Sequence, residues 1–215
     1  MKLLKEIPKG LQLSYVLFVT GDGPHESRVC QGLTSQFNGN EINLLNFRSP
    51  LPPQRVTGLP SLIAVRTYIA EFSARYFIWT CDKEYFVDST DWTEQVNAEL
   101  MNRGANATVS SRWGDAARFD VKLGPKEAIL WCALTGTSAG GRLEENLSQL
   151  IYMEFQEKVA PDKEEIRSAL NRRRLKIETL ISQAKKPNLR QAAPSLFSVF
   201  EDVENQLSSH NVTSP

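Results

Sequence analysis

The sequence has no excess of charge of either sign and no long hydrophobic run. Twenty-five basic residues balance twenty-five acidic ones in a chain of 215, so the molecule as a whole has no field that would attract nucleic acid or an anionic membrane. The apolar run at residues 13–19 is much shorter than the roughly 20 residues of a membrane span. Glu6, Pro8 and Lys9 precede it, which is unlike a signal peptide. We therefore expect no membrane span and a cytoplasmic protein.

Cysteine and histidine are also scarce. The three cysteines are Cys30, Cys81 and Cys132. Their odd number, wide spacing and apolar surroundings predict reduced core residues and no disulfide framework. His25 and His210 are the two histidines, and without paired cysteines they give no recognisable metal-ligand spacing, so we expect no metal and no cofactor. His25 directly follows Pro24, which is typical of a solvated loop histidine.

The first half of the chain alternates apolar and polar residues with a period of two, which predicts β-strands. The Asn-Gly-Asn sequence at residues 38–40 predicts a hairpin turn, and Asp82-Lys83 predicts a second one. Prolines between residues 49 and 60 break regular structure there. Residues 61–72 suit either a strand or a helix, and their β-branched and aromatic content favours a strand. The expected strands are residues 11–20, 28–37, 41–47, 61–72, 73–81 and 84–88.

One helix and three further strands follow. Asp91 and Glu94 form a helix start signal, and Gly104 closes the helix. Turn signals then separate short apolar runs. The expected strands are residues 107–113, 118–123 and 127–134.

The composition of the sequence changes after Gly141, because no glycine occurs in the rest of the chain. Apolar residues recur there at helical spacing, and prolines delimit the helices. The sequence thus predicts an α+β fold: a mostly antiparallel sheet in the N-terminal two-thirds with one inserted helix, followed by about three helices. We expect a mainly β domain at residues 1–141, a helical region at 142–207 that packs on it or forms a helical hairpin, and a disordered tail at 208–215.

The C-terminal helices carry narrow apolar seams whose residues step by three or four. The seam residues are Leu170, Arg173, Ile177, Leu180, Leu196, Phe200, Val203 and Leu207. Such a seam suits a helical hairpin or the helix of a partner, although burial against the sheet would use the same spacing. A polar residue such as Arg173 within a seam helps to set register or partner choice. The favoured function is therefore a non-enzymatic protein-binding or assembly module that self-associates or docks a protein partner through these helices.

Ser138 lies in a Gly-x-Ser-x-Gly pattern between a predicted strand and a predicted helix, which is the setting of a nucleophile elbow. The sequence Gly-Thr-Ser-Ala-Gly-Gly at residues 136–141 resembles the serine loop of the patatin-like lipases. The resemblance implies a serine acyl hydrolase with Ser138 as the catalytic nucleophile, which is the first alternative function. It is confined to this loop, because that family's downstream Asp-Gly motif has no counterpart after Gly141. Asp162 and His210 formally complete a triad in the order of the α/β-hydrolases.

The same loop has two further interpretations. Consecutive backbone N–H groups at a helix start, next to Arg142, make a plausible anion-binding nest. Alternatively, the glycines supply a change of chain direction, and Thr137 or Ser138 caps the helix.

Nucleic-acid binding is the second alternative function. A basic helix at residues 171–190 could follow a phosphate backbone. Its cations are Arg172, Arg174, Lys176, Lys185 and Lys186. Acidic residues in the same stretch, such as Glu178, also permit an ordinary solvated surface. A separate acidic cluster, with Asp82, Glu84, Asp88 and Asp91, is best explained by turns and helix caps.

Overall fold

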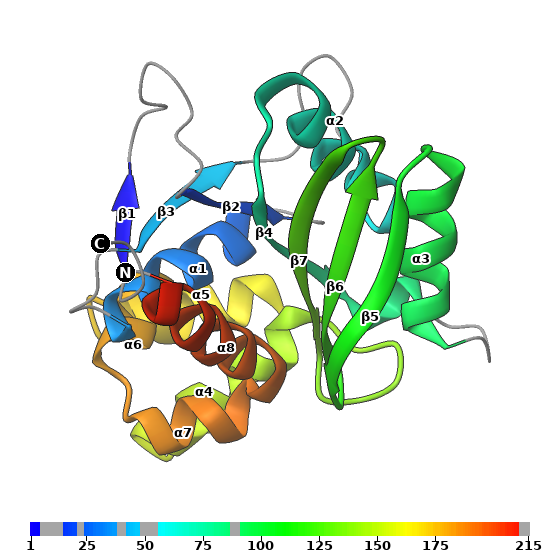
Figure 1. The fold of residues 1–215 in the computed structure, drawn as a ribbon. Helices are drawn as coiled ribbons and strands as arrows, with labels where there is room; N and C mark the ends of the chain where they lie inside the picture. The colour runs from blue at the N-terminus through cyan, green and yellow to red at the C-terminus, as the bar shows by residue number, and fades with distance from the viewer. Residues whose placement is uncertain (5–14, 21–23, 38–41, 48–55, 87–90, 211–215) are drawn as a thin grey trace.

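The computed structural model describes residues 1–4, 15–20, 24–37, 42–47, 56–86 and 91–210. These residues form a seven-stranded sheet with helices on both faces (Figure 1). The strands in spatial order are β1 (Lys2–Leu4), β3 (Asn43–Phe47), β2 (Tyr15–Thr20), β4 (Tyr76–Asp82), β7 (Lys126–Thr135), β6 (Ala116–Leu123) and β5 (Asn106–Trp113).

The sheet is mixed, and the class α+β is confirmed in this coarse sense. The prediction of a mostly antiparallel sheet is wrong, because four of the six pairings in the described residues are parallel, from β1 through β3, β2 and β4 to β7. The other two described pairings, β7 with β6 and β6 with β5, are antiparallel. The central strands are covered on both faces, so they are buried almost continuously, as parallel strands usually are.

Two predicted strands are helices. Residues 28–37 lie mostly in α1 (Pro24–Gln36), where Val29 and Leu33 are four residues apart and both buried. Residues 61–72 lie mostly in α2 (Ile63–Phe72), preceded by the short 3-10 helix η1 (Leu59–Leu62). The first predicted hairpin is therefore wrong, because β2 and β3 pair in parallel and α1 connects them. Its turn residues, 38–40, lie outside the described part of the chain.

The second predicted hairpin is also wrong. β4 is followed by the 3-10 helix η2 (Lys83–Tyr85), and β4 pairs with β2 and β7. Residues 87 and 88 of this prediction lie outside the described residues. The next elements are confirmed: α3 (Trp92–Asn102) begins after Asp91, which accepts a hydrogen bond from the Thr93 N–H at 2.8 Å. The strands predicted at 107–134 are β5, β6 and β7.

In the described residues, five helices follow Gly141, where about three were expected. They are α4 (Leu143–Phe155), α5 (Lys163–Arg172), α6 (Ile177–Gln183), α7 (Lys186–Ala192) and α8 (Pro194–His210). Helices α4 and α5 end without a glycine. Gln156, directly after α4, and Arg174, in the turn after α5, adopt left-handed conformations with φ of 56° and 55°. Pro187 lies near the start of α7 and does not end a helix. Residues 208–210 of the predicted tail are helical, and residues 211–215 are not described.

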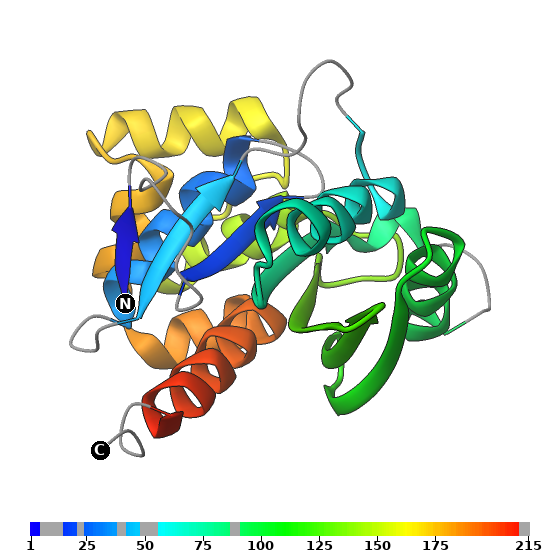
Figure 2. The same ribbon diagram turned by 45° about the horizontal axis from the view of Figure 1, so that its top comes forward.

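Two apolar clusters, one on each face of the sheet, form the core. Helices α2 and α3 cover one face, and α1 together with the C-terminal helices covers the other (Figures 1 and 2). The last helix, α8, packs on β7 and β6. Its buried Ser195 hydroxyl donates a hydrogen bond of 2.6 Å to the Leu134 carbonyl of β7. The division of the chain into units at residue 141 stays a prediction.

No helix in the described segments has the length and apolar composition needed to cross a membrane.

Candidate functional site

The parallel strands β2, β4 and β7 end at the same edge of the sheet, their carboxyl edge (Figure 1). After β2 the chain turns to β3 on one side, and β4 then lies on the other side of β2. Sheets of this kind bind their ligands at the point where the strand order reverses. Helix α1 starts after β2, and helix α4 starts after β7, so both helix N-termini belong to this edge.

Asp82, the last residue of β4, joins the strand ends to α4. One of its carboxylate oxygens accepts a hydrogen bond from the Leu143 N–H at 2.8 Å and another from the Thr135 hydroxyl. Both Asp82 and Thr135 are buried. Asp82 therefore caps a helix that starts 61 residues later in the chain. The sequence predicts Asp82 in a hairpin turn, so this long-range cap differs from the predicted role of the residue.

His25 and Glu144 pair at the start of α1 and α4. The Nδ1 atom of His25 lies 3.1 Å from Oε1 of Glu144. The Glu144 side chain is 6 % exposed and that of His25 is 19 % exposed. Lys163, at the start of α5, places its ammonium 3.9 Å from the same carboxylate oxygen. A nearly buried carboxylate thus contacts an imidazole that is partly exposed to solvent.

The pKa of Glu144 lies below its ordinary value. Burial acts in the opposite direction and raises this pKa, but hydrogen bonds from His25 and from the backbone N–H of Glu144, together with the Lys163 charge, outweigh it. Glu144 is therefore ionised at neutral pH and acts only as an acceptor. The hydrogen on Nδ1 of His25 must point at Glu144, which leaves Nε2 of a neutral ring with its lone pair.

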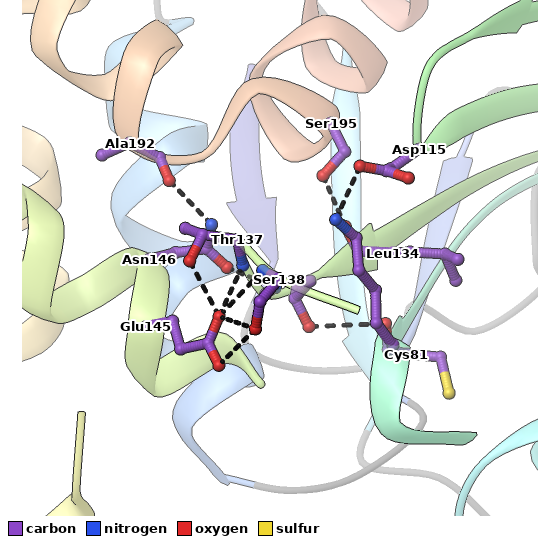
Figure 3. Close-up of polar contacts among 12 residues, drawn as sticks. Cys81, Asp115, Leu134, Thr137, Ser138, Glu145, Asn146, Ala192 and Ser195 are labelled. Carbon is purple, nitrogen blue, oxygen red and sulfur yellow. Dashed lines mark hydrogen bonds and ion pairs between the residues drawn. The ribbon is translucent and has the colours of Figure 1, made fainter. Parts of the chain in front are cut away.

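The glycine loop, residues 136–141, folds around the carboxylate of Glu145 (Figure 3). Oε2 of Glu145 accepts hydrogen bonds from the backbone N–H groups of Thr137 and Ser138, at 2.8 and 3.1 Å. The hydroxyl of Thr137 donates to it at 2.8 Å, and the Ser138 hydroxyl lies 3.1 Å from both carboxylate oxygens. The chain thus supplies its own anion to the predicted nest.

Two glycines are required by this arrangement. Gly136 has φ of +106°, and a Cβ there would lie 2.4 Å from the carbonyl carbon of Gly141. A Cβ on Gly141 would lie 2.5 Å from Oε2 of Glu145. Asn146 closes the other side: its Oδ1 accepts from the Gly136 N–H at 2.6 Å, and its Nδ2 donates to the Ala192 carbonyl at 2.7 Å. A change of direction and a close approach of the chain therefore explain the glycines.

A cavity lies on each side of the glycine loop. The first, of about 470 Å³, is formed with the outer face of α4 and contains Ser138, Glu145, Tyr152 and Lys158 among its lining residues. The second, of about 230 Å³, is formed with η2, the start of α3 and the end of β5.

Among the described residues, no hydrogen bond joins Ser138 to Asp162 of the predicted hydrolase. Asp162 caps α5 by accepting a hydrogen bond from the Glu164 N–H at 2.8 Å. The side chain of His210 lies outside what the structure describes. The polar partner of the Ser138 hydroxyl in the described residues is Glu145. Cys30 is a buried free cysteine, as predicted, and burial raises the pKa of its thiol.

The predicted basic helix is three separate helices joined by turns. Arg172 ends α5, Arg174 is left-handed, and Lys176 and Lys185 precede the first residues of α6 and α7. Arg172 pairs with Glu157, and Lys186 lies 5.3 Å from the ring centroid of Phe37. Arg142 at the glycine loop pairs with Glu84 at 2.7 Å. Among the described residues, no group of three or more acidic, histidine or cysteine side chains could hold a metal ion.

Apart from Arg173, the seam residues of the C-terminal helices lie inside the molecule. The buried members belong to the cluster between these helices and the sheet; they are Leu170, Ile177, Leu180, Leu196, Phe200, Val203 and Leu207. Arg173 remains partly exposed, pairs with Glu157, and places its guanidinium 4.6 Å from the ring centroid of Phe155. The apolar spacing is therefore used for packing within the chain.

No local sequence pattern indicates the pair of His25 and Glu144, because the two residues are 119 positions apart. Each follows the end of a strand, and recognising β2 and β7 as parallel strands of one sheet would have placed them at the same edge. The chain matches no protein-family model, and no curated protein or solved structure is significantly similar to it.

Proposed function

We propose that the protein is an enzyme that uses His25 as a general acid–base on a small polar substrate at the carboxyl edge of the parallel strands. The observation that carries this proposal is the 3.1 Å contact between His25 Nδ1 and the nearly buried Glu144 carboxylate. A buried carboxylate that orients an imidazole is the arrangement by which many enzymes prepare a general base.

The chemistry follows from the tautomer. With Nδ1–H held by Glu144, the lone pair of Nε2 can take a proton from water or from a substrate hydroxyl. The imidazolium that forms is stabilised by the ionised carboxylate, and it can return the proton to a leaving group. The N-termini of α1 and α4 carry partial positive charge at the same edge, and this charge favours a negative charge developing on the substrate.

Hydrolysis of activated esters tests the proposal. p-Nitrophenyl acetate and bis(p-nitrophenyl) phosphate serve as an acyl and a phosphodiester probe, and release of p-nitrophenol is followed between pH 5 and 8. We expect His25→Gln to reduce turnover of at least one probe about 100-fold or more, because general acid–base catalysis typically contributes that much. Glu144→Gln should reduce kcat more than it changes KM, because the residue positions the catalytic ring.

His210→Gln is the matched control, because it removes the other histidine. It should leave turnover unchanged. The proposal would be overturned if His25→Gln turned over the probes as fast as the native chain, or if the native chain turned over neither probe. The pair of His25 and Glu144 would then serve only to join α1 to α4.

A serine acyl hydrolase remains the second candidate, supported by the contact between Ser138 and Glu145 at the rim of the larger cavity. The backbone N–H groups of Thr137 and Ser138 already bind the Glu145 carboxylate, so an oxyanion would have to compete with that carboxylate for them. Covalent labelling by a fluorophosphonate that disappears in Ser138→Ala would favour this candidate over the His25 mechanism.

The other two functions stay predictions. Docking of a protein partner, or self-association, would have to use outer faces of the C-terminal helices, since their seam is buried. Sedimentation at rising protein concentration tests it, and a strict monomer removes self-association. Nucleic-acid binding predicts salt-dependent retention on DNA or RNA that weakens in a double variant, Arg172→Ala with Arg174→Ala.

A further inference from the structure

The larger cavity beside the glycine loop is a groove along the outer face of α4. Its volume is about 470 Å³, within the range of about 300–1,000 Å³ that is usual for small-molecule sites. Every lining residue lies between positions 137 and 161, inside the continuously described segment 91–210. One stretch of the chain therefore forms the whole groove.

The floor of the groove is one face of α4, because its lining residues recur at spacings of three and four. They are Glu145, Ser148, Gln149 and Tyr152. The glycine loop forms one wall and is tied to the floor by its hydrogen bonds to Glu145. The chain after α4 forms another wall, which the Ser148 hydroxyl holds by donating a hydrogen bond to the Val159 carbonyl. The groove is thus formed before any ligand binds.

Several polar side chains of the lining are not used within the protein. Among the described residues, no hydrogen bond or ion pair joins the side chains of Gln149, Tyr152 or Lys158 to another residue. Tyr152 is 43 % exposed, so its ring and its hydroxyl are accessible from solvent. The hydroxyls of Ser138 and Ser148 act as donors within the chain, and their oxygens can still accept a hydrogen bond. The groove therefore offers accessible donors and acceptors.

The lining side chains of the groove have no net charge. Its two charged residues, Glu145 and Lys158, are of opposite sign. An anion in the groove would be repelled by the carboxylate, and a cation would be repelled by the ammonium. The apolar part of the lining is small and consists mainly of the Tyr152 ring, Val159 and Pro161. These features favour a neutral, polar ligand with one apolar face.

We propose that this groove binds a neutral carbohydrate, such as a single hexose ring. A sugar ring has a face of C–H groups that packs on the Tyr152 ring. Each sugar hydroxyl both donates and accepts hydrogen bonds, which matches the Gln149 amide, itself a donor and an acceptor, and the donors of Lys158. The proposal depends neither on the His25 mechanism nor on catalysis by Ser138.

The test titrates the full chain with glucose, galactose, mannose and N-acetylglucosamine and follows its backbone N–H resonances by NMR. At least one sugar should bind with a Kd of about 2 mM or lower, as typical ligand efficiencies give for a molecule of this size. Tyr152→Ala removes the packing surface and should weaken that sugar about fivefold or more. Gln149→Leu keeps a side chain of similar size without its polar atoms and should weaken it about fivefold.

Phe72→Ala is the matched control, because Phe72 is an aromatic residue of α2 with a similar exposure of 47 % and is not part of the groove lining. It should bind the sugars as the native chain does, and so should His25→Gln. The proposal is overturned if none of the four sugars binds, or if the affinity is unchanged in Tyr152→Ala or in Gln149→Leu. Ester turnover tests the His25 mechanism, so the two proposals can fail separately.

Discussion

The Nε1–H of Trp131 donates a hydrogen bond of 2.7 Å to Oδ2 of Asp202, and this bond joins the middle of the sheet to the last helix. The same oxygen lies 3.0 Å from a guanidinium nitrogen of Arg118 on the neighbouring strand. Trp131 is fully buried and Asp202 is largely buried. One carboxylate therefore satisfies a buried donor of β7 and a charged donor of β6 from α8.

Replacing Asp202 by alanine should lower the free energy of unfolding by about 2 kcal/mol, because it leaves the buried Trp131 N–H without an acceptor. Urea denaturation followed by tryptophan fluorescence measures the change. The matched control is Glu201→Ala, which removes the adjacent carboxylate from an exposed pair with Arg190. Its effect should stay below about 1 kcal/mol. Equal losses in the two variants would contradict the role of Asp202.

Asp82→Ala should destabilise the junction of β4 and α4 by about 2 kcal/mol or more, since it leaves the Leu143 N–H and the Thr135 hydroxyl without their acceptor in a buried setting. Asp115→Ala is the control at this edge, because the Asp115 side chain is half exposed and pairs with Lys83 among the described residues. We expect it to change the free energy of unfolding by less than about 1 kcal/mol. Urea denaturation distinguishes the two cases.

The glycine loop allows a comparison of two left-handed positions. Gly136→Ala combines a φ of +106° with a Cβ 2.4 Å from backbone, so it should cost about 3 kcal/mol or more. Gly140→Ala has φ of +71° and open space around the new Cβ, so the conformational strain alone should cost about 1 kcal/mol. Similar thermal unfolding of the two variants would show that the loop repacks freely.

Glu145 should stabilise the chain in a pH-dependent way. Burial raises its pKa, but hydrogen bonds from Thr137 and Ser138 outweigh that effect and bring the pKa below its ordinary value of 4.5. A lowered folded-state pKa contributes stability that is present above 4.5 and is lost as the pH falls through the folded pKa. Glu145→Gln should therefore be less stable than the native chain at pH 7, and the difference should shrink at lower pH.

Urea denaturation at intervals from pH 7 to pH 3 measures this difference. Glu164→Gln is the control, because Glu164 lies on the exposed surface in a pair with Arg167. The variant Glu145→Gln is compared with the native chain by the difference in their free energies of unfolding. If this difference stays constant or grows as the pH falls, the loop does not depend on the ionised carboxylate.

Local sequence patterns correctly predicted those elements that are defined by residues close together in the chain. The Asp91 cap of α3 and the turns between β5, β6 and β7 were found because each is defined within a few residues. The α1 helix was not predicted because residues 28–37 were interpreted as a strand from period-two alternation, and Gly32 also lowers helix propensity. The structure explains this glycine by a contact with α6, since a Cβ on Gly32 would lie 2.6 Å from the Cβ of Ile181. No local pattern contains that contact.

The candidate site depends on the parallel order of the sheet in the same way. Reading α1 as a strand made the first half an antiparallel series of hairpins, which separates His25 from residue 144 and hides the common edge. The glycine loop was placed correctly between a strand and a helix. Its internal anion, Glu145, was not foreseen, because the pattern Gly-x-Ser-x-Gly says nothing of a carboxylate seven residues after the serine.

The burial of α8 has a consequence for the order in which the chain can fold during synthesis. The cluster on the α2 and α3 face is drawn from residues 17–134, so it can close once β7 has left the ribosome. The opposite cluster includes Phe197, Phe200 and Val203 of the final helix. Until this helix has emerged from the ribosome, the nascent chain exposes a broad apolar surface of the sheet. Intermediates of this kind aggregate or recruit chaperones.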